Sequence, residues 1–114
     1  MANKFGAAPA DVGGIHFDSR REAERWQDLK ILERSGRICG LRRQVPYTLI
    51  PSQKIGGKVI ERPCKYVADF VYEKDGQTVV EDVKGCKRGA AYAVFAIKRK
   101  LMLYIHGIRV TEVS

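Results

Sequence analysis

Two stretches decide the fold of this chain: Lys65-Tyr-Val-Ala-Asp-Phe-Val-Tyr72 and Thr78-Val-Val-Glu-Asp-Val-Lys84. Both are rich in valine and aromatic residues, and Asp75-Gly76 supplies a turn between them, so they predict a β-hairpin. Each strand also carries an aspartate, at Asp69 and Asp82, although aspartate is depleted in strands. The hairpin therefore brings acidic groups into a sheet, which indicates that they have a role in the chemistry of the protein.

One face of this hairpin is predicted to collect charged groups. Side chains alternate faces along a strand, which groups Val67, Asp69 and Val71 on the first strand and Val80, Asp82 and Lys84 on the second. If the two faces match, two acids and a lysine meet on adjacent strands. Carboxylates bind hard divalent cations, which activate water and stabilise a leaving oxygen, and a lysine orients the water or stabilises a phosphate.

The doubled acid at Glu81-Asp82 leaves the ligand assignment open. Alternation puts Glu81 on the opposite face, with Val79 and Val83, and so selects Asp82, with the Val83 carbonyl as a further ligand. A β-bulge would reverse the faces and select Glu81 instead. A purely structural role for Asp69, as an ion-pair partner of Lys84, is the alternative to a metal site.

The rest of the chain supplies two helices and two more strands. A helix is predicted from Asp18-Ser19 to Gly36, with an apolar stripe of Ala23, Trp26, Leu29 and Leu32. Ile38–Ile50 is predicted as a strand in which Pro46 indicates a sheet edge or a bulge, and Pro51–Lys58 as a turn or flexible loop. A heavily packed helix over Ala90–Tyr104 and a strand over Ile108–Val113 follow. The order helix, three strands, helix, strand predicts an α/β fold, a mixed sheet of about four strands flanked by helices.

Glu22 has two readings. Ser19 with Glu22 forms a capping box, in which either Asp18 or Ser19 is the cap, and this alone explains the glutamate. Glu22 also lies one turn before Trp26, at the border of the apolar face, from which it can look into the sheet. Gln44 and Lys98 read by themselves as solvent-facing polar residues.

Length and composition indicate one soluble globular domain. The 114 residues are 45% hydrophobic and 30% charged. A flexible arm is expected over residues 1–16 and a single domain over residues 17–114. No apolar run is long enough for a membrane span and no secretory signal opens the chain, so no membrane partner is predicted. Three widely spaced cysteines indicate free thiols in a reducing, cytoplasmic compartment.

The charge points to a polyanionic partner. Twenty-one Lys and Arg against 13 Asp and Glu give a net charge of +8. Between Val83 and Thr111 there is no acidic residue, while this segment contains Lys87, Arg88, Lys98, Arg99 and Lys100, the candidate nucleic-acid-binding residues. A one-signed stretch beside a pair of carboxylates favours nucleic acid over a merely solvated face.

The pattern resembles the PD-(D/E)XK nuclease superfamily, and within it small phage and prophage proteins related to the resolvase-like phage endonuclease I. The matching segments are Ser19–Ala23, Gly36–Gln44, Lys65–Phe70, Val80–Gly85 and Ile97–Leu101, and they span from about Phe17 to Val113. The Asp…Asp-x-Lys signature alone is short and promiscuous, and the order of the elements around it makes the match more specific. Ala68 stands where the family often has proline.

The resemblance implies a restriction-endonuclease-like fold and a DNA endonuclease that uses Mg²⁺ or Mn²⁺. It implies Asp69 and Asp82 as metal ligands, Lys84 as the catalytic lysine and Glu22 as an active-site acid that is also a metal ligand. Gln44, Lys98 and Glu81 become possible site-lining residues. It further implies a homodimer that acts on branched or recombination intermediates, in the bacterial host cytoplasm if the chain is phage-encoded.

Two alternative functions would explain the net positive charge without any phosphodiester hydrolysis. A non-catalytic DNA-binding module of the same fold would explain the basic segment, although it has no need of two acids and a lysine together. An RNA-binding protein fits the charge but gives no reason for the acids, and it would need aromatic residues on an open sheet face.

Overall fold

The computed structural model describes residues 8–114, which form two helices and eight strands. In chain order these are β1 (Ala10–Val12), β2 (Ile15–Phe17), α1 (Arg20–Arg34), β3 (Cys39–Ile50), β4 (Gln53–Ile55), β5 (Lys58–Glu61), β6 (Cys64–Lys74), β7 (Gln77–Val83), α2 (Ala90–His106) and β8 (Thr111–Val113).

The main sheet has four strands in the order β3-β6-β7-β8. β3, β6 and β7 pair antiparallel, and β8 joins β7 in parallel after the crossover through α2. The predicted hairpin is therefore confirmed as β6–β7, and its turn residues Asp75 and Gly76 both have positive φ, as a tight two-residue turn requires. The predicted α/β class, with a mixed four-stranded sheet and helices, is confirmed. So is the edge position of β3, the strand that contains Pro46.

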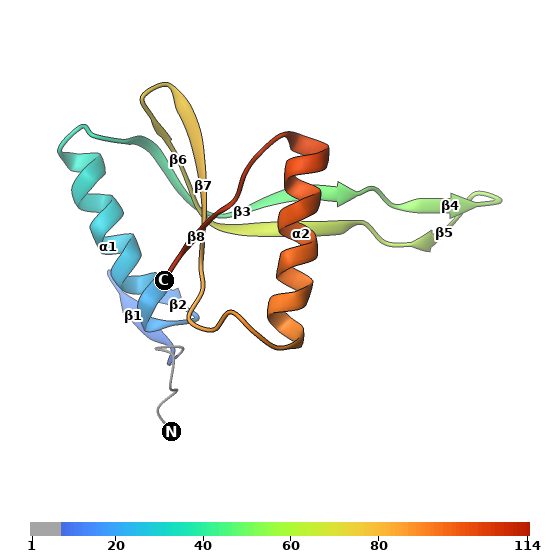
Figure 1. The fold of residues 1–114 in the computed structure, drawn as a ribbon, viewed down its shortest axis with the longest axis horizontal. Helices are drawn as coiled ribbons and strands as arrows, with labels where there is room; N and C mark the ends of the chain where they lie inside the picture. Colours follow the sequence, from blue (N-terminus) through green and yellow to red (C-terminus); the bar gives the residue numbers. More distant parts are fainter. Residues whose placement is uncertain (1–7) are drawn as a thin grey trace.

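The two helices lie apart in the fold (Figure 1), and each packs on its own hydrophobic cluster. We call the first the α1 cluster, since Ala23 and Leu29 of α1 pack there with Phe17, Phe70 and Tyr72. The predicted stripe of α1 is confirmed, because Trp26 and Leu32 border this cluster. The second is the α2 cluster, which contains Phe95 and Met102 of α2 with Leu49, Tyr66, Ala68, Val71, Val80 and Val110.

Strand β6 moves from one cluster to the other near its middle. Ala68 and Val71 both belong to the α2 cluster, whereas Phe70 belongs to the α1 cluster. In a regular strand Ala68 and Phe70 would share a face, so the alternation slips by one residue around Asp69. The simple alternation predicted for Val67, Asp69 and Val71 therefore does not hold.

The neighbouring strand slips at the same level. Leu41 packs against the α1 cluster and Val45 against the α2 cluster, and Gln44 between them has φ of 54°. Positive φ is uncommon for a residue other than glycine and marks a local backbone irregularity. Because both strands slip together, their register is the same on either side, and Gln44 lies opposite Asp69.

Three segments differ from the sequence prediction. Residues 10–16 were predicted as part of a flexible arm, but Ala10–Phe17 forms the β1–β2 hairpin, held by Val12 and Ile15 against the α1 cluster; residues 1–7 of that arm lie outside the described part. The loop predicted over Pro51–Lys58 instead contains β4 and the start of β5, which pair around Gly56-Gly57. The final strand is shorter than predicted.

Helix α2 is less buried than predicted. Its side chains Ile97, Leu103 and Tyr104 are exposed, because only the face with Phe95 and Met102 meets the sheet. Within residues 8–114, neither helix has the length and apolarity needed to cross a bilayer.

Candidate active site

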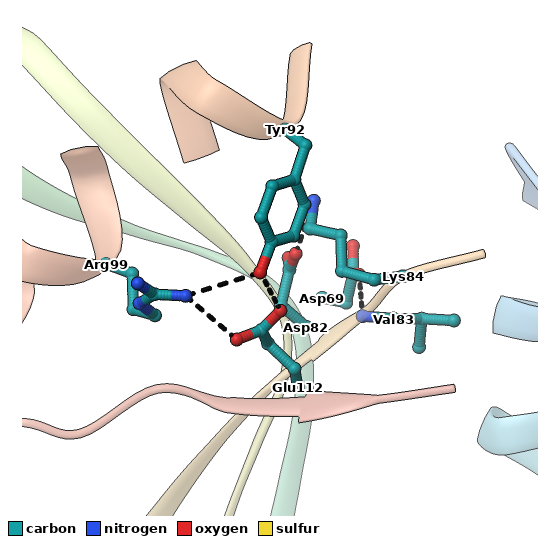
Figure 2. Close-up of polar contacts among 7 residues, drawn as sticks. All are labelled: Asp69, Asp82, Val83, Lys84, Tyr92, Arg99 and Glu112. Atoms are coloured by element: carbon teal, nitrogen blue, oxygen red, sulfur yellow. Dashed lines mark hydrogen bonds and ion pairs between the residues drawn. The ribbon is translucent and has the colours of Figure 1, made fainter. Parts of the chain in front are cut away.

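The two aspartates lie side by side on neighbouring strands. The β6–β7 ladder pairs Phe70 with Glu81, so the next position along places Asp69 opposite Asp82. Ladder pairing stops at this point, and an oxygen of Asp69 instead accepts a hydrogen bond from the Val83 amide at 2.8 Å. The slip in β6 thus turns the Asp69 carboxylate toward the end of β7 (Figure 2).

Lys84 directly follows β7 and joins the pair. Its Nζ lies 2.7 Å from Oδ2 of Asp82 (Figure 2). The same Nζ lies 4.0 Å from the ring centroid of Phe95 on α2. The lysine is therefore held between a carboxylate and an aromatic face, which fix the position of its ammonium group. In the structure, Asp69, Asp82 and Lys84 lie together at the end of the β6–β7 pair, as the sequence predicted.

Burial and neighbouring charges raise the pKa values of Asp69 and Glu22. Asp82 is buried. Burial of Asp69 itself, together with the charge of the neighbouring Asp82, raises the pKa of Asp69 to about 8. Burial also raises the pKa of Glu22, with further contributions from Asp18 and Asp82, while Arg43 and Lys84 oppose the rise. The carboxyl groups of Asp69, Asp82 and Glu22 are therefore close enough to interact electrostatically. The positive charges of Arg43 and Lys84 oppose the rise in the pKa of Glu22. Such clustering of perturbed carboxyls is typical of functional sites.

Glu22 is close to the site and also takes part in the helix start. Ser19 is the cap of α1, since its hydroxyl accepts a hydrogen bond from the Glu22 amide at 3.1 Å. This contact uses the backbone of Glu22 and not its carboxylate. The half-buried carboxylate is thus available to the cluster, whose charges contribute to its raised pKa.

Glu81 is committed to the other face of the sheet. Its carboxylate receives two hydrogen bonds from Arg25 of α1, at 2.8 Å from Nε and 2.6 Å from the terminal nitrogen, and a short one from the Tyr72 hydroxyl. Glu81 thus bonds toward α1, as alternation predicted, and its oxygens are occupied there.

The other predicted residues are distributed around the site. Lys98 lines an open cleft of about 280 Å³ together with Asp82, Lys84, Tyr66 and Lys65. Gln44 is exposed on β3, opposite Asp69. Lys87 and Arg88 are exposed in the loop that leads from Lys84 to α2, and Lys100 is exposed on α2. Arg99 is engaged elsewhere, in an ion pair with Glu112 at 3.0 Å.

Sequence reasoning missed two residues near the site. The Tyr66 hydroxyl is buried, and burial together with the charges of Asp82 and Asp69 raises the pKa of Tyr66. Glu112 of β8 pairs in register with Asp82. Although burial opposes it, hydrogen bonds from Tyr92 (2.7 Å) and Arg99 lower the pKa of Glu112 (Figure 2). Neither is visible in a local motif, because both depend on strand pairing across the sheet.

Residues 8–114 contain no cluster of three or more His, Cys, Asp or Glu side chains arranged to hold a metal. The two aspartates nevertheless fit Mg²⁺, which usually binds through one or two carboxylates and keeps several waters. All three cysteines are free thiols and lie outside this site.

Residues 2–111 match the family described as "Protein of unknown function (DUF1064)". The chain belongs to the DUF1064 family. The match includes Glu22, Asp69, Asp82 and Lys84. No curated protein and no solved structure matches this DUF1064 chain with significant similarity.

Proposed function

We propose that this protein is a DNA endonuclease that requires Mg²⁺ or Mn²⁺ and hydrolyses phosphodiester bonds. The observation that carries the proposal is the meeting of Asp69, Asp82 and Lys84 at one end of the β6–β7 pair, beside an open cleft lined with lysines. The order α1, β3, β6, β7, α2, β8 supports membership of the PD-(D/E)XK superfamily and a restriction-endonuclease-like fold.

The electrostatics of the pair support a resident cation. Without a cation, the pair avoids repulsion at neutral pH only because Asp69, whose pKa is raised to about 8, holds a proton beside Asp82 and Lys84. A divalent cation would compensate both carboxylates in place of that proton. Asp69 and Asp82 would hold the metal, and the Glu22 carboxylate would approach it from α1. A bound divalent ion would supply Lewis acidity toward the phosphate and a water of lowered pKa.

The chain's own residues bind and orient the phosphodiester. Lys84 Nζ lies at the cleft and donates to a non-bridging phosphate oxygen or to the attacking water. Asp82 and Phe95 restrict where that ammonium can lie. Lys98 of α2 and Lys65 of β6, which both line the cleft, attract the flanking phosphates.

The net charge and the basic loop support DNA as the partner. Lys87 and Arg88 directly follow the catalytic segment and are exposed, so a strand bound at Lys84 would run past them. The resemblance to resolvase-like proteins favours branched or recombination intermediates and a homodimer that cuts two strands symmetrically.

One observation favours a second candidate, a DNA-binding module without catalysis. Lys84 is already paired with Asp82, and no third acid completes a metal cluster within residues 8–114. A Mg²⁺ titration separates the two functions, since the module would show neither a metal site nor hydrolysis.

The test is a cleavage panel of linear duplex, single-stranded, flapped and four-way DNA, with and without Mg²⁺. We expect cleavage of at least one substrate that depends on Mg²⁺ and is lost in Lys84→Ala. A protein that cleaves none of them with Mg²⁺ or Mn²⁺, or an Lys84→Ala protein that cuts like the wild type, would refute the proposal.

A further inference from the structure

The β4–β5 hairpin, Gln53–Glu61, projects from the body of the protein and has no task in the proposed active site. It continues the long strands β3 and β6 beyond the α2 cluster and extends away from both helices (Figure 1). All its strand residues are exposed, including Ile55 (73%), Val59 (53%) and Ile60 (57%). We call this hairpin the arm.

In the arm, aliphatic side chains lie across the hairpin from lysines. Across the two strands Ile55 pairs with Lys58, and Lys54 pairs with Val59. Partners in register point to the same face of a hairpin, so each of these two pairs places one aliphatic side chain next to one lysine. Ile60, at the irregularity in the β4–β5 register, is a third exposed aliphatic side chain. The lysines interrupt the apolar surface of the arm, whereas the core of a protein interface is depleted of charged residues.

The charge of the arm continues the charge of the cleft. Arg62 and Lys65 lie at the base of the arm, and Lys65 also lines the cleft that contains Asp82 and Lys84. Between Ser52 and Lys65 there is one acidic residue, Glu61, against four basic ones. A basic track therefore runs from the cleft to the tip of the arm.

The span from the tip of the arm to the proposed active site matches one turn of duplex DNA. Lys58 precedes Asp69 by eleven positions, which corresponds to at most about 36 Å of extended chain. One turn of B-DNA is about 34 Å long, and a two-stranded β-ribbon is narrow enough to enter a groove.

We propose that the arm is a DNA-binding element that lies in a groove of the duplex about one turn from the scissile phosphate. Lys54 and Lys58 contact phosphates, while Ile55 and Val59 pack on sugars or base edges. The partner class rests on the proposed function, because the groove position is measured from a phosphate held at Asp69 and Lys84.

The test is fluorescence-anisotropy binding of a labelled duplex three helical turns long, in EDTA, over a series of salt concentrations. The variant is Lys54→Ala/Lys58→Ala. The matched control is Arg37→Ala/Lys74→Ala, which removes the same charge from exposed positions at the opposite end of the sheet. Melting temperatures establish that both proteins are folded.

We expect the arm variant to bind up to about 60-fold more weakly at 0.1 M salt and to lower the salt slope by about 1.8, since each phosphate contact contributes about 0.9. The control should change neither the affinity nor the slope by a comparable amount. Equal loss in both variants would show that only net charge matters and would overturn the proposal. Unchanged binding by the arm variant would overturn it as well.

Two further readouts separate the arm from its surroundings. A small phosphodiester, thymidine 5′-(4-nitrophenyl) phosphate, does not reach the arm, so the arm variant should hydrolyse it like the wild type. Absence of DNA cleavage by every protein with Mg²⁺ or Mn²⁺ would refute the nuclease, while arm-dependent DNA binding would still stand. If sedimentation shows that the arm variant turns a dimer into a monomer, the arm is a subunit contact and the proposal fails.

Discussion

Glu81 and Asp82 are neighbours in β7, yet their carboxylates bond on opposite faces of the sheet. Glu81 meets Arg25 and Tyr72 beneath α1, and Asp82 meets Lys84 at the cleft. The first arrangement satisfies its acid within the protein. The second leaves an acid beside another acid, Asp69, whose pKa is raised. The two residues are therefore expected to respond differently to substitution.

Glu81→Ala should damage stability, not metal binding. The change leaves Arg25 partly buried without its carboxylate, and breaking a buried pair costs about 3 kcal/mol. Urea denaturation measures this loss, and Mn²⁺ affinity of the folded fraction should match the wild type. Lost Mn²⁺ binding with normal stability would instead make Glu81 the ligand.

Lys84→Ala should lower the rate of Mg²⁺-dependent DNA cleavage by at least about 10²-fold, because it removes a charged donor from the transition state. Asp69→Asn should also abolish cleavage by weakening the metal site. Both proteins should still retain DNA, since the exposed basic residues remain. Lys74→Ala, a change of the same type at the far end of β6, is the control and should cut normally.

Ser19→Ala and Glu22→Gln should separate the two roles at the start of α1. Ser19→Ala removes the cap hydrogen bond, so we expect a loss of about 1 kcal/mol in the free energy of unfolding and little change in cleavage per folded molecule. Glu22→Gln keeps the cap, whose bond uses the backbone amide, and should lower cleavage. Full activity in Glu22→Gln would leave the glutamate with no part in catalysis.

The metal-free protein should lose stability as the pH rises from about 4 toward 8. The pKa of Asp69 is raised from an ordinary value of 3.8 to about 8 by burial and by Asp82. Between these values the folded protein holds a proton that the unfolded chain has released, so the free energy of unfolding falls, by up to about 1.4 kcal/mol per pH unit. Asp69→Asn has no such proton and should flatten this dependence in urea titrations. An identical slope in both proteins would remove Asp69 as its source.

Regular patterns in the sequence predicted much of the architecture. Apolar spacing predicted α1, and Asp75-Gly76 between two valine-rich runs predicted β6–β7. The alternation at Val79, Val80, Glu81 and Asp82 separated the two acids, because β7 stays regular there. Pro46 predicted an edge position or a bulge for its strand, and that strand lies at the edge of the sheet.

The rest depended on contacts that no local pattern records. The shift in side-chain alternation at Gln44 and Asp69 depends on both strands together. Neither residue predicts it from the sequence of its own strand. The β1–β2 hairpin follows from packing of Val12 and Ile15 on the α1 cluster. Glu112 reaches the level of Asp82 only because β8 returns in parallel after α2.

The most direct test of the central claim is a Mn²⁺ titration of the DNA-free protein by isothermal calorimetry near pH 8, comparing the wild type with Asp82→Asn. The claim is that Asp69 and Asp82 together hold a divalent cation. We expect saturable binding to the wild type, with release of protons, and loss of binding in Asp82→Asn. Equal heats from the two proteins, or no binding by the wild type, would contradict the claim.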